Sequence, residues 1–235
     1  MPNLKDIEIN PQFACALEIM EHTRNSVFVT GKAGTGKSTL LEYFRSITNK
    51  KIVVLAPTGV AALNVKGQTI HSFFKFKPNI NLDKIRKTKR SGSSSIYRQL
   101  DAIVIDEISM VRSDMLDCID KFLRLNGKDR TKPFGGIQMI FIGDLYQLPP
   151  VVTREEKGIF AGHYKSQYFF DAKVMESFAM EYIELEKIYR QKDAAFIEIL
   201  YGFKEFFVLF EFLSDILKAS AELYNFSAFC GKTVA

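Results

Sequence analysis

A glycine-rich segment near the N-terminus has the residue types needed to hold a chain of phosphates. The sequence GKAGTGKS at 31–38 matches G-x-x-x-x-G-K-[ST] and is followed by Thr39. Glycines let successive backbone N–H groups turn towards phosphate oxygens, and the N-terminus of a following helix adds partial positive charge. Lys37 supplies a charge for the β- and γ-phosphates, and Ser38 a hydroxyl for Mg²⁺. We therefore expect a nucleoside triphosphate and Mg²⁺ as cofactors, bound by Gly31, Ala33, Gly34, Thr35, Gly36, Lys37, Ser38 and Thr39.

Two acids directly follow an apolar run farther along the chain. Asp106 and Glu107 come after the run 102–105, so they are expected at the carboxyl edge of a sheet. Asp106 there can hold Mg²⁺ together with Ser38, and Glu107 can orient and deprotonate an attacking water molecule. An acidic pair is common on protein surfaces. It indicates catalysis here because the phosphate-binding segment precedes it in the same predicted sheet.

Two further polar residues follow apolar runs and are candidates for sensing a γ-phosphate. Gln147, in the run GDLYQLPPV at 143–151, has an amide that can bond a phosphate oxygen or the lytic water. Arg190, in EKIYRQ at 186–191, has a guanidinium that can spread transition-state charge. The same patterns also fit a proline-stiffened turn with a solvent-facing glutamine, and a surface arginine. Both alternatives stay open at this point.

The chain contains the regular elements that would position these groups. Apolar runs at 26–30, 52–56, 102–105, 138–142 and 182–185 predict strands. Apolar residues at helical spacing follow Lys37 and recur over 115–123. Continuous apolar strands separated by helices are typical of a parallel sheet with helices on both faces. We expect an α/β fold, a P-loop NTPase domain.

Composition limits the class of protein further. Of the 235 residues, 47% are hydrophobic and 25% charged, proportions that disfavour wholesale disorder and a coiled coil. No apolar run is long enough to cross a bilayer, the N-terminus lacks the features of a secretory signal, and the three cysteines form no CxxC pair. We expect an intracellular protein with no membrane partner.

Two segments depart from this pattern. Residues 75–98 hold eight Lys and Arg residues against one acid, Asp83, and include the run SGSSS at 91–95. A local basic excess suggests a polyanion partner, although a solvated, mobile loop gives the same composition. Residues 201–235 hold seven of the 21 phenylalanines, several of them at helical spacing, and no chemical motif. We expect an atypical helical tail there.

Several motifs together resemble the PIF family of DNA helicases, superfamily one B, to which RecD is related. They occur in the family's order: APTGVAA at 56–62, QTIHSFF at 68–74, DEISM at 106–110, PFGGIQ at 133–138, GDLYQLPPV at 143–151 and YRQ at 189–191. The resemblance covers about residues 8–200. It implies the first of two RecA-like motor domains of an ATP-driven helicase that moves 5′ to 3′ along single-stranded DNA, with family roles in DNA repair, recombination and telomere maintenance.

The resemblance also implies roles for individual residues. Lys37, Glu107, Gln147 and Arg190 correspond to catalytic positions, and Gln12 to a glutamine that reads adenine. Contacts to single-stranded DNA are implied for Pro57, Thr58, His71, Phe73 and Lys75. The ring of Phe73 or Phe74 can stack on a base, but phenylalanine is also the usual residue of a core. The basic segment 75–98 takes the place of the family's strand-separating wedge.

The chain after Leu200 shows none of the motifs of a second motor domain. We therefore expect residues 1–200 to form the motor domain, residues 201–235 to be an atypical tail, and unwinding to need a second RecA-like domain supplied by a full-length protein. A stand-alone module that binds nucleotide or single-stranded DNA is the alternative. A small P-loop kinase is disfavoured, because it has no use for the runs at 57–62 and 143–151. The compartment is expected to be the cytoplasm in a bacterium, and the nucleus or mitochondrion in a eukaryote.

Overall fold

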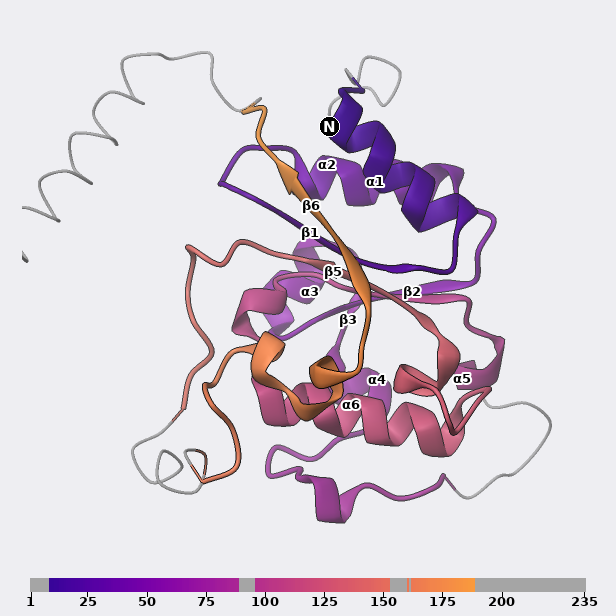
Figure 1. The fold of residues 1–235 in the computed structure, drawn as a ribbon, viewed down its shortest axis with the longest axis vertical. Helices are drawn as coiled ribbons and strands as arrows, with labels where there is room; N and C mark the ends of the chain where they lie inside the picture. The colour runs from indigo at the N-terminus through magenta and orange to yellow at the C-terminus, as the bar shows by residue number, and fades with distance from the viewer. Residues whose placement is uncertain (1–8, 89–95, 153–159, 161, 189–235) are drawn as a thin grey trace, which may run out of the picture. The chain divides into compact units, whose positions relative to one another are not determined.

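Six parallel strands form the centre of the molecule in the computed structural model (Figure 1). The structure describes residues 9–88, 96–152, 160 and 162–188. The strand order is β3-β2-β4-β5-β1-β6, and every pair of neighbouring strands is parallel. The strands are β1 (Ser26–Gly31), β2 (Ile52–Ala56), β3 (Gln68–Thr69), β4 (Ala102–Ile105), β5 (Gln138–Ile142) and β6 (Met180–Leu185). The parallel sheet predicted from the apolar runs is confirmed.

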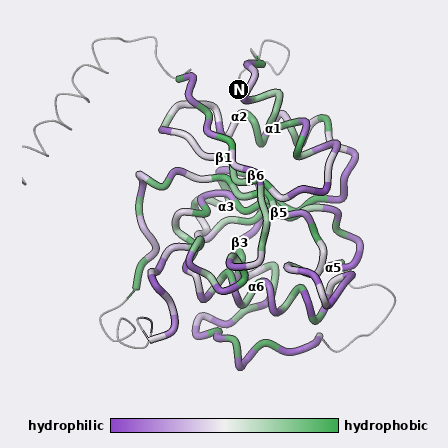
Figure 2. The backbone as a smooth tube through the Cα atoms, in the orientation of Figure 1, coloured by the Kyte–Doolittle hydropathy of each residue, from purple (hydrophilic) through white to green (hydrophobic). Residues whose placement is uncertain are grey.

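Both faces of the sheet are buried, which explains why its strands are continuously apolar. Val27 and Val29 of β1 point to one hydrophobic cluster, and Phe28 between them points to the other. The first cluster is covered by α1 (Pro11–His22) and α2 (Lys37–Ile47), and the second by α4 (Ile70–Phe74) and α6 (Ser113–Asn126). Figure 2 shows the hydrophobic residues concentrated along the strands between these two helical layers. Alternate residues therefore face opposite layers, as a doubly covered sheet requires.

Short elements complete the described chain. They are the helices α3 (Gly59–Asn64) and α5 (Ile96–Gln99), and the 3₁₀ turns Leu82–Lys84, Ile108–Met110, Pro133–Gly136, Phe169–Asp171 and Lys173–Glu176. All described residues belong to one compact unit, Met1–Tyr189. The predicted tail 201–235 lies outside the described residues. No helix among the described residues is both long and apolar enough to cross a membrane.

A lysine joins three segments at the amino-terminal edge of the sheet. The ammonium of Lys50 donates to the carbonyls of Met20 and Thr23 at 2.6 and 2.7 Å, and to the side-chain oxygen of Gln138 at 2.7 Å. Burial lowers the pKa of this lysine, against the opposing charge of Glu21. The cation thus satisfies carbonyls at the end of α1 and fixes α1 against the start of β5.

The described part of the basic segment packs on α6. Phe76 and Ile85 are buried, and Lys121 of α6 donates to the carbonyl of Leu82 at 2.8 Å. The backbone N–H of Thr88 donates to Asn126 at 2.8 Å. Its cations remain exposed: they are Lys75, Lys77, Lys84, Arg86 and Lys87. Over residues 75–88 the segment is thus a docked strap with a charged outer side, where sequence composition alone suggested a mobile loop.

Candidate active site

The glycine-rich segment forms an open loop between β1 and α2. Gly34 and Gly36 have φ values of 86° and 92°, which side chains with a Cβ rarely adopt. Gly36 occupies the N-cap of α2 without any side-chain hydrogen bond, so the first N–H groups of that helix stay available to an anion. Thr35 is buried, and its hydroxyl donates to the carbonyl of Lys32 at 2.9 Å. A contact within the loop therefore helps to fix its shape.

Lys37 lies over this loop. Its ammonium donates to the carbonyls of Gly31 at 2.6 Å and Lys32 at 3.1 Å. Burial lowers the pKa of Lys37, and the negative charges of Asp144, Glu107 and Asp106 oppose that shift. These three carboxylates come from the ends of β4 and β5, so the strand ends bring them near the lysine. This position was predicted from the sequence for Asp106 and Glu107 but not for Asp144.

The acidic pair combines burial with an unusual backbone. Burial, and then the negative charge of Glu107, raise the pKa of Asp106 to about 6, although Lys37 and the backbone N–H of Glu107 pull it down. Glu107 has a φ of 51°, in the left-handed region that is costly for a residue with a side chain. Backbone strain of this kind is concentrated at functional sites.

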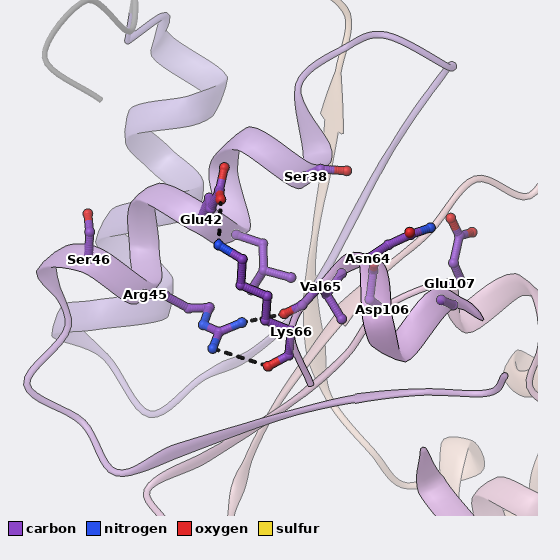
Figure 3. A pocket seen from close by; sticks show the side chains of 11 residues that line it. Ser38, Glu42, Arg45, Ser46, Asn64, Val65, Lys66, Asp106 and Glu107 are labelled. Atoms are coloured by element: carbon purple, nitrogen blue, oxygen red, sulfur yellow. Dashed lines mark hydrogen bonds and ion pairs between the residues drawn. The ribbon is translucent and has the colours of Figure 1, made fainter. Parts of the chain in front are cut away.

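A pocket of about 360 Å³ joins the acids to α2 and α3 (Figure 3). Ser38, Asn64, Asp106 and Glu107 lie along one part of it, and Glu42, Arg45 and Lys66 along another. Arg45 of α2 donates to the carbonyls of Val65 and Lys66 just after α3. The pocket thus connects the helix that follows the phosphate loop with a helix that follows β2.

The donor set fits Mg²⁺ and a triphosphate. Magnesium prefers hard oxygen ligands and is usually bound through one or two carboxylates together with substrate phosphates. Ser38 and Asp106 supply a hydroxyl and a carboxyl in the same pocket. Among the described residues there is no group of three or more His, Cys, Asp or Glu side chains that would make a protein-only metal cage.

Gln147 is oriented by a buried acid that sequence analysis did not single out. Its side-chain N–H donates to Asp144 at 3.0 Å, and the other carboxyl oxygen of Asp144 accepts the backbone N–H of Tyr146 at 3.0 Å. Asp144 is only 4% exposed. A Cβ at Gly143 would lie 2.9 Å from Ile108, so the turn after β5 packs closely against the residue after Glu107. The sequence did hold a signal for Asp144, because an acid stands two residues after the apolar run 138–142.

The residues for which the resemblance implies DNA contacts follow β2 and β3. These two strands lie at one side of the sheet, and β1 lies towards the other side. The hydroxyl of Thr58 accepts the N–H of Ala61 and caps α3, while Pro57 and His71 are half-buried. Lys75 is exposed, with a φ of 56°. Phe73 is 8% exposed and packs edge-on against Phe74 and Tyr97.

This packing makes Phe73 a core residue in the structure. Its ring has no free face for a base, and Phe74 is buried still more deeply, at 2%. The expectation that either ring stacks on DNA is therefore not supported. Arg190 lies outside the described residues. Gln12 lies in the first turn of α1 and donates to the carboxylate of Glu186 at 2.9 Å.

Comparison with known proteins agrees with these motifs. The PIF1-like helicase family matches residues 13–203. The ATP-dependent DNA helicase PIF1 of Saccharomyces cerevisiae is 36% identical over 197 residues, covering 78% of this chain and 21% of the yeast protein. The human protein of the same name is 36% identical over 178 residues, covering 74% of this chain and 26% of the human protein.

Solved structures give the same result. A Bacteroides Pif1 bound to single-stranded DNA is 38% identical, with a TM-score of 0.73, and its Candida albicans counterpart is 32% identical, with a TM-score of 0.63. The first match covers 84% of this chain and 46% of the Bacteroides chain, and the second covers 83% of this chain and 44% of the Candida chain. A further Bacteroides Pif1 structure was solved with ADP-AlF3 and single-stranded DNA. The present chain spans about a fifth to a quarter of the curated relatives and under half of these solved chains. From its motifs, its fold and these matches, the chain belongs to the PIF1-like helicase family.

Proposed function

We propose that residues 1–200 form the ATP-binding and ATP-hydrolysing motor domain of a DNA helicase that moves 5′ to 3′ along single-stranded DNA. The main support is the meeting of three strand ends at one sheet edge: Lys37 after β1, Asp106 and Glu107 after β4, and Asp144 after β5, with their charges acting on Lys37. The relatives named as ATP-dependent DNA helicases support the substrate class.

Each residue has a distinct role in this proposal. The loop 31–36 and the first N–H groups of α2 hold the phosphates, and Lys37 exchanges its carbonyl partners for the β- and γ-phosphates. Ser38 and Asp106 hold Mg²⁺, which when bound neutralises charge on the phosphates. Glu107 accepts a proton from the attacking water, and Gln147 contacts the γ-phosphate or that water. Arg190 is proposed to spread the developing charge, and Gln12 to read adenine.

DNA contacts and a second domain complete the proposed motor. Pro57, Thr58, His71 and Lys75 are proposed to contact single-stranded DNA, together with the cations of the basic segment. Because this chain matches less than half of the solved relatives, we propose that unwinding needs a second RecA-like domain. Roles in DNA repair, recombination and telomere maintenance are proposed on the family resemblance.

The first test measures ATP turnover by the 235-residue chain with and without single-stranded DNA, and again after fusion to a second motor domain. We expect the DNA to raise turnover, most strongly in the fusion. Lys37→Ala should remove nucleotide binding or reduce turnover by at least about a hundredfold, because the phosphates lose their main positive charge. Normal turnover in that variant would refute the site. ATP binding without turnover in the fusion would favour the alternative, a nucleotide-binding module.

A further inference from the structure

We propose that Glu186 is a positioning residue that fixes the side-chain amide of Gln12 and thereby makes the site prefer adenine over guanine nucleotides. The inference rests on the proposed function, because it takes the loop 31–38 as the phosphate site. It adds a determinant of base specificity that no motif indicates. The pair joins segments 174 residues apart in sequence.

The pair lies beside the phosphate loop. Strand β6 runs parallel to β1, and its last residue, Leu185, is in register with Gly31, the first residue of the loop. Contact there is close, since a Cβ at Gly31 would lie 2.5 Å from the carbonyl oxygen of Leu185. Glu186 is the next residue, so it leaves the sheet at the edge where the loop begins. Figure 1 shows the end of β6 near the start of α1.

The backbone of Gln12 is held firmly, which leaves only its side chain to be oriented. Asn10 caps α1 by accepting the N–H of Phe13 at 2.8 Å, and Pro11 occupies the first helical turn. Phe13 is 1% exposed and packs edge-on against Tyr43 of α2. The first turn of α1 is thus fixed to the helix that follows the phosphate loop.

Glu186 determines which end of the amide faces it. A carboxylate only accepts hydrogen bonds, whereas an amide has a donor NH₂ at one side and an acceptor oxygen at the other. The NH₂ group of Gln12 donates to Glu186 at 2.9 Å, so the amide oxygen is directed away from the carboxylate. Turning the amide over would place its oxygen against a negative charge, which is unfavourable.

This orientation distinguishes the two purines. Glutamine pairs with adenine by accepting from the exocyclic amino group and donating to N7, and one amide N–H stays available for N7 while the other bonds Glu186. Guanine has a carbonyl oxygen where adenine has the amino group, so it would face the amide oxygen of Gln12. Both O6 and N7 of guanine are acceptors, so accepting guanine requires the NH₂ group of Gln12 to face them, which turns the amide and breaks its bond to Glu186.

The test compares Glu186→Gln with the unchanged 235-residue chain. Glutamine at 186 can either donate or accept, so the amide of Gln12 can turn over without losing a partner. Dissociation constants for fluorescently labelled ATP and GTP analogues, measured by anisotropy with Mg²⁺, give the preference as a ratio. We expect the ratio to fall about three- to tenfold, the contribution of one hydrogen bond to an equilibrium constant.

Two control experiments distinguish the orientation of the Gln12 amide from the effect of removing a negative charge. Glu184→Gln removes the same charge two residues earlier on β6, where the nearest partner is the Tyr182 hydroxyl at 3.5 Å, and should leave the ratio unchanged. Removing charge alone strengthens the binding of both nucleotides and leaves their ratio as it was. In a Gln12→Ala background, Glu186→Gln should have no further effect on the ratio.

The possible results distinguish a failure of the Glu186 role from a failure of the proposed function. An unchanged ratio in Glu186→Gln, or an equal fall in Glu184→Gln, overturns the positioning role while ATP binding stands. Wild-type chain that binds ATP and GTP equally also overturns it. Wild-type chain that binds neither nucleotide overturns the proposed function itself.

Discussion

Ionisation of the Asp106 carboxyl group destabilises the folded state. Its pKa is raised to about 6 by burial first and by Glu107 second, whereas an unfolded aspartate titrates near 3.8. A carboxyl whose pKa is raised in the folded state favours folding most at a pH below about 3.8, where it is protonated in both the folded and the unfolded state. That stabilisation is lost as the pH rises through about 6. At neutral pH the metal-free chain therefore carries a destabilising charge that a bound cation would relieve.

Asp106→Asn should stabilise the metal-free chain at pH 8, by on the order of 2 kcal/mol, because it removes that buried charge. The gain should be clearly smaller at pH 5, where the wild-type carboxyl binds a proton. Urea denaturation of both proteins at the two pH values measures this difference. An equal gain at both values would mean that the charge of Asp106 is not what destabilises the fold. The same variant should lose Mg²⁺-dependent nucleotide binding, a trade of function against stability.

Glu107 combines a backbone in the left-handed region with a carboxylate whose charge acts on Lys37 and Asp106. Glu107→Gln keeps the size and the backbone of the residue and removes only its basicity, so ATP binding should persist while hydrolysis falls by about a hundredfold or more. Equilibrium binding of a labelled ATP analogue and phosphate release from ATP measure the two effects separately. Hydrolysis at the wild-type rate would exclude Glu107 as the base.

At the scale of elements, the junction of β1 with β6 is the tightest part of the site. Gly31→Ala would place a Cβ 2.5 Å from the carbonyl of Leu185 and 2.6 Å from the hydroxyl of Thr35. The end of β6 and the phosphate loop must then move apart. We expect the free energy of unfolding to fall by about 2–4 kcal/mol, in the range of overpacked cores and forbidden backbone, and ATP affinity to fall with it.

The matched control is Gly59→Ala, the first residue of α3. A Cβ there meets nothing within 4 Å, and alanine favours a helix, so stability should stay the same or rise by up to about 1 kcal/mol. Urea denaturation of both variants gives the comparison. If Gly31→Ala were as stable as Gly59→Ala, close packing of β6 on the loop would be disproved.

Long strands were easier to predict than short elements. The apolar runs locate β1, β2, β4 and β5 to within one residue at each end, and β6 to within two, because burial on both faces leaves little else in those positions. Strand β3 has two residues and no apolar run, so nothing marks it. The helices α3 and α4 have five or six residues and depend on Thr58 and Thr69 as caps rather than on periodicity.

The candidate site was predictable where it depends on strand ends. Parallel strands bring their carboxyl ends to one edge, so Lys37 and Asp106 could be placed together from sequence. Contacts between side chains of distant segments could not: Gln12 with Glu186, and Arg45 with the carbonyls after α3, depend on how helices pack. Sequence patterns also suggested a stacking role for Phe73, because an aromatic residue looks the same whether it meets a base or a core.

On the scale of the whole molecule, the proposed nucleotide and DNA residues occupy different ends of one sheet edge. Residues for ATP follow β1 and β6, and those for DNA follow β2 and β3, with the acids after β4 between them. The pocket between α2 and α3 connects these regions. A change at the γ-phosphate therefore has a short structural route to the proposed DNA face.

The exposed cations of the docked strap provide a test of DNA binding. Replacing Lys84, Arg86 and Lys87 by glutamine should weaken binding to labelled single-stranded DNA and flatten its salt dependence. The slope of log affinity against log salt should change by about 0.7 for each phosphate that the protein no longer neutralises. Anisotropy titrations at several salt concentrations measure the slope. An unchanged slope would show that the strap is only solvated.

Three cations elsewhere serve as the control for that experiment. Lys128, Arg130 and Lys132 are exposed in the loop that enters β5, at the opposite, amino-terminal edge of the strands. Their replacement by glutamine changes the net charge equally. It should leave the slope near the wild-type value, because short-range phosphate contacts and not overall charge determine it.

The position of β1 in the strand order affects how the chain can be made in a cell. Its two neighbours are β5 and β6, so the strand that leads into the phosphate loop is synthesised before both of its partners and stays unpaired until residues 138–142 and 180–185 follow. Pairings this distant in sequence form slowly, and an unpaired apolar strand is prone to aggregate. The nascent chain should therefore expose β1 until residues 138–142 have been made, and chaperones that capture extended apolar segments would be expected to bind it during that interval.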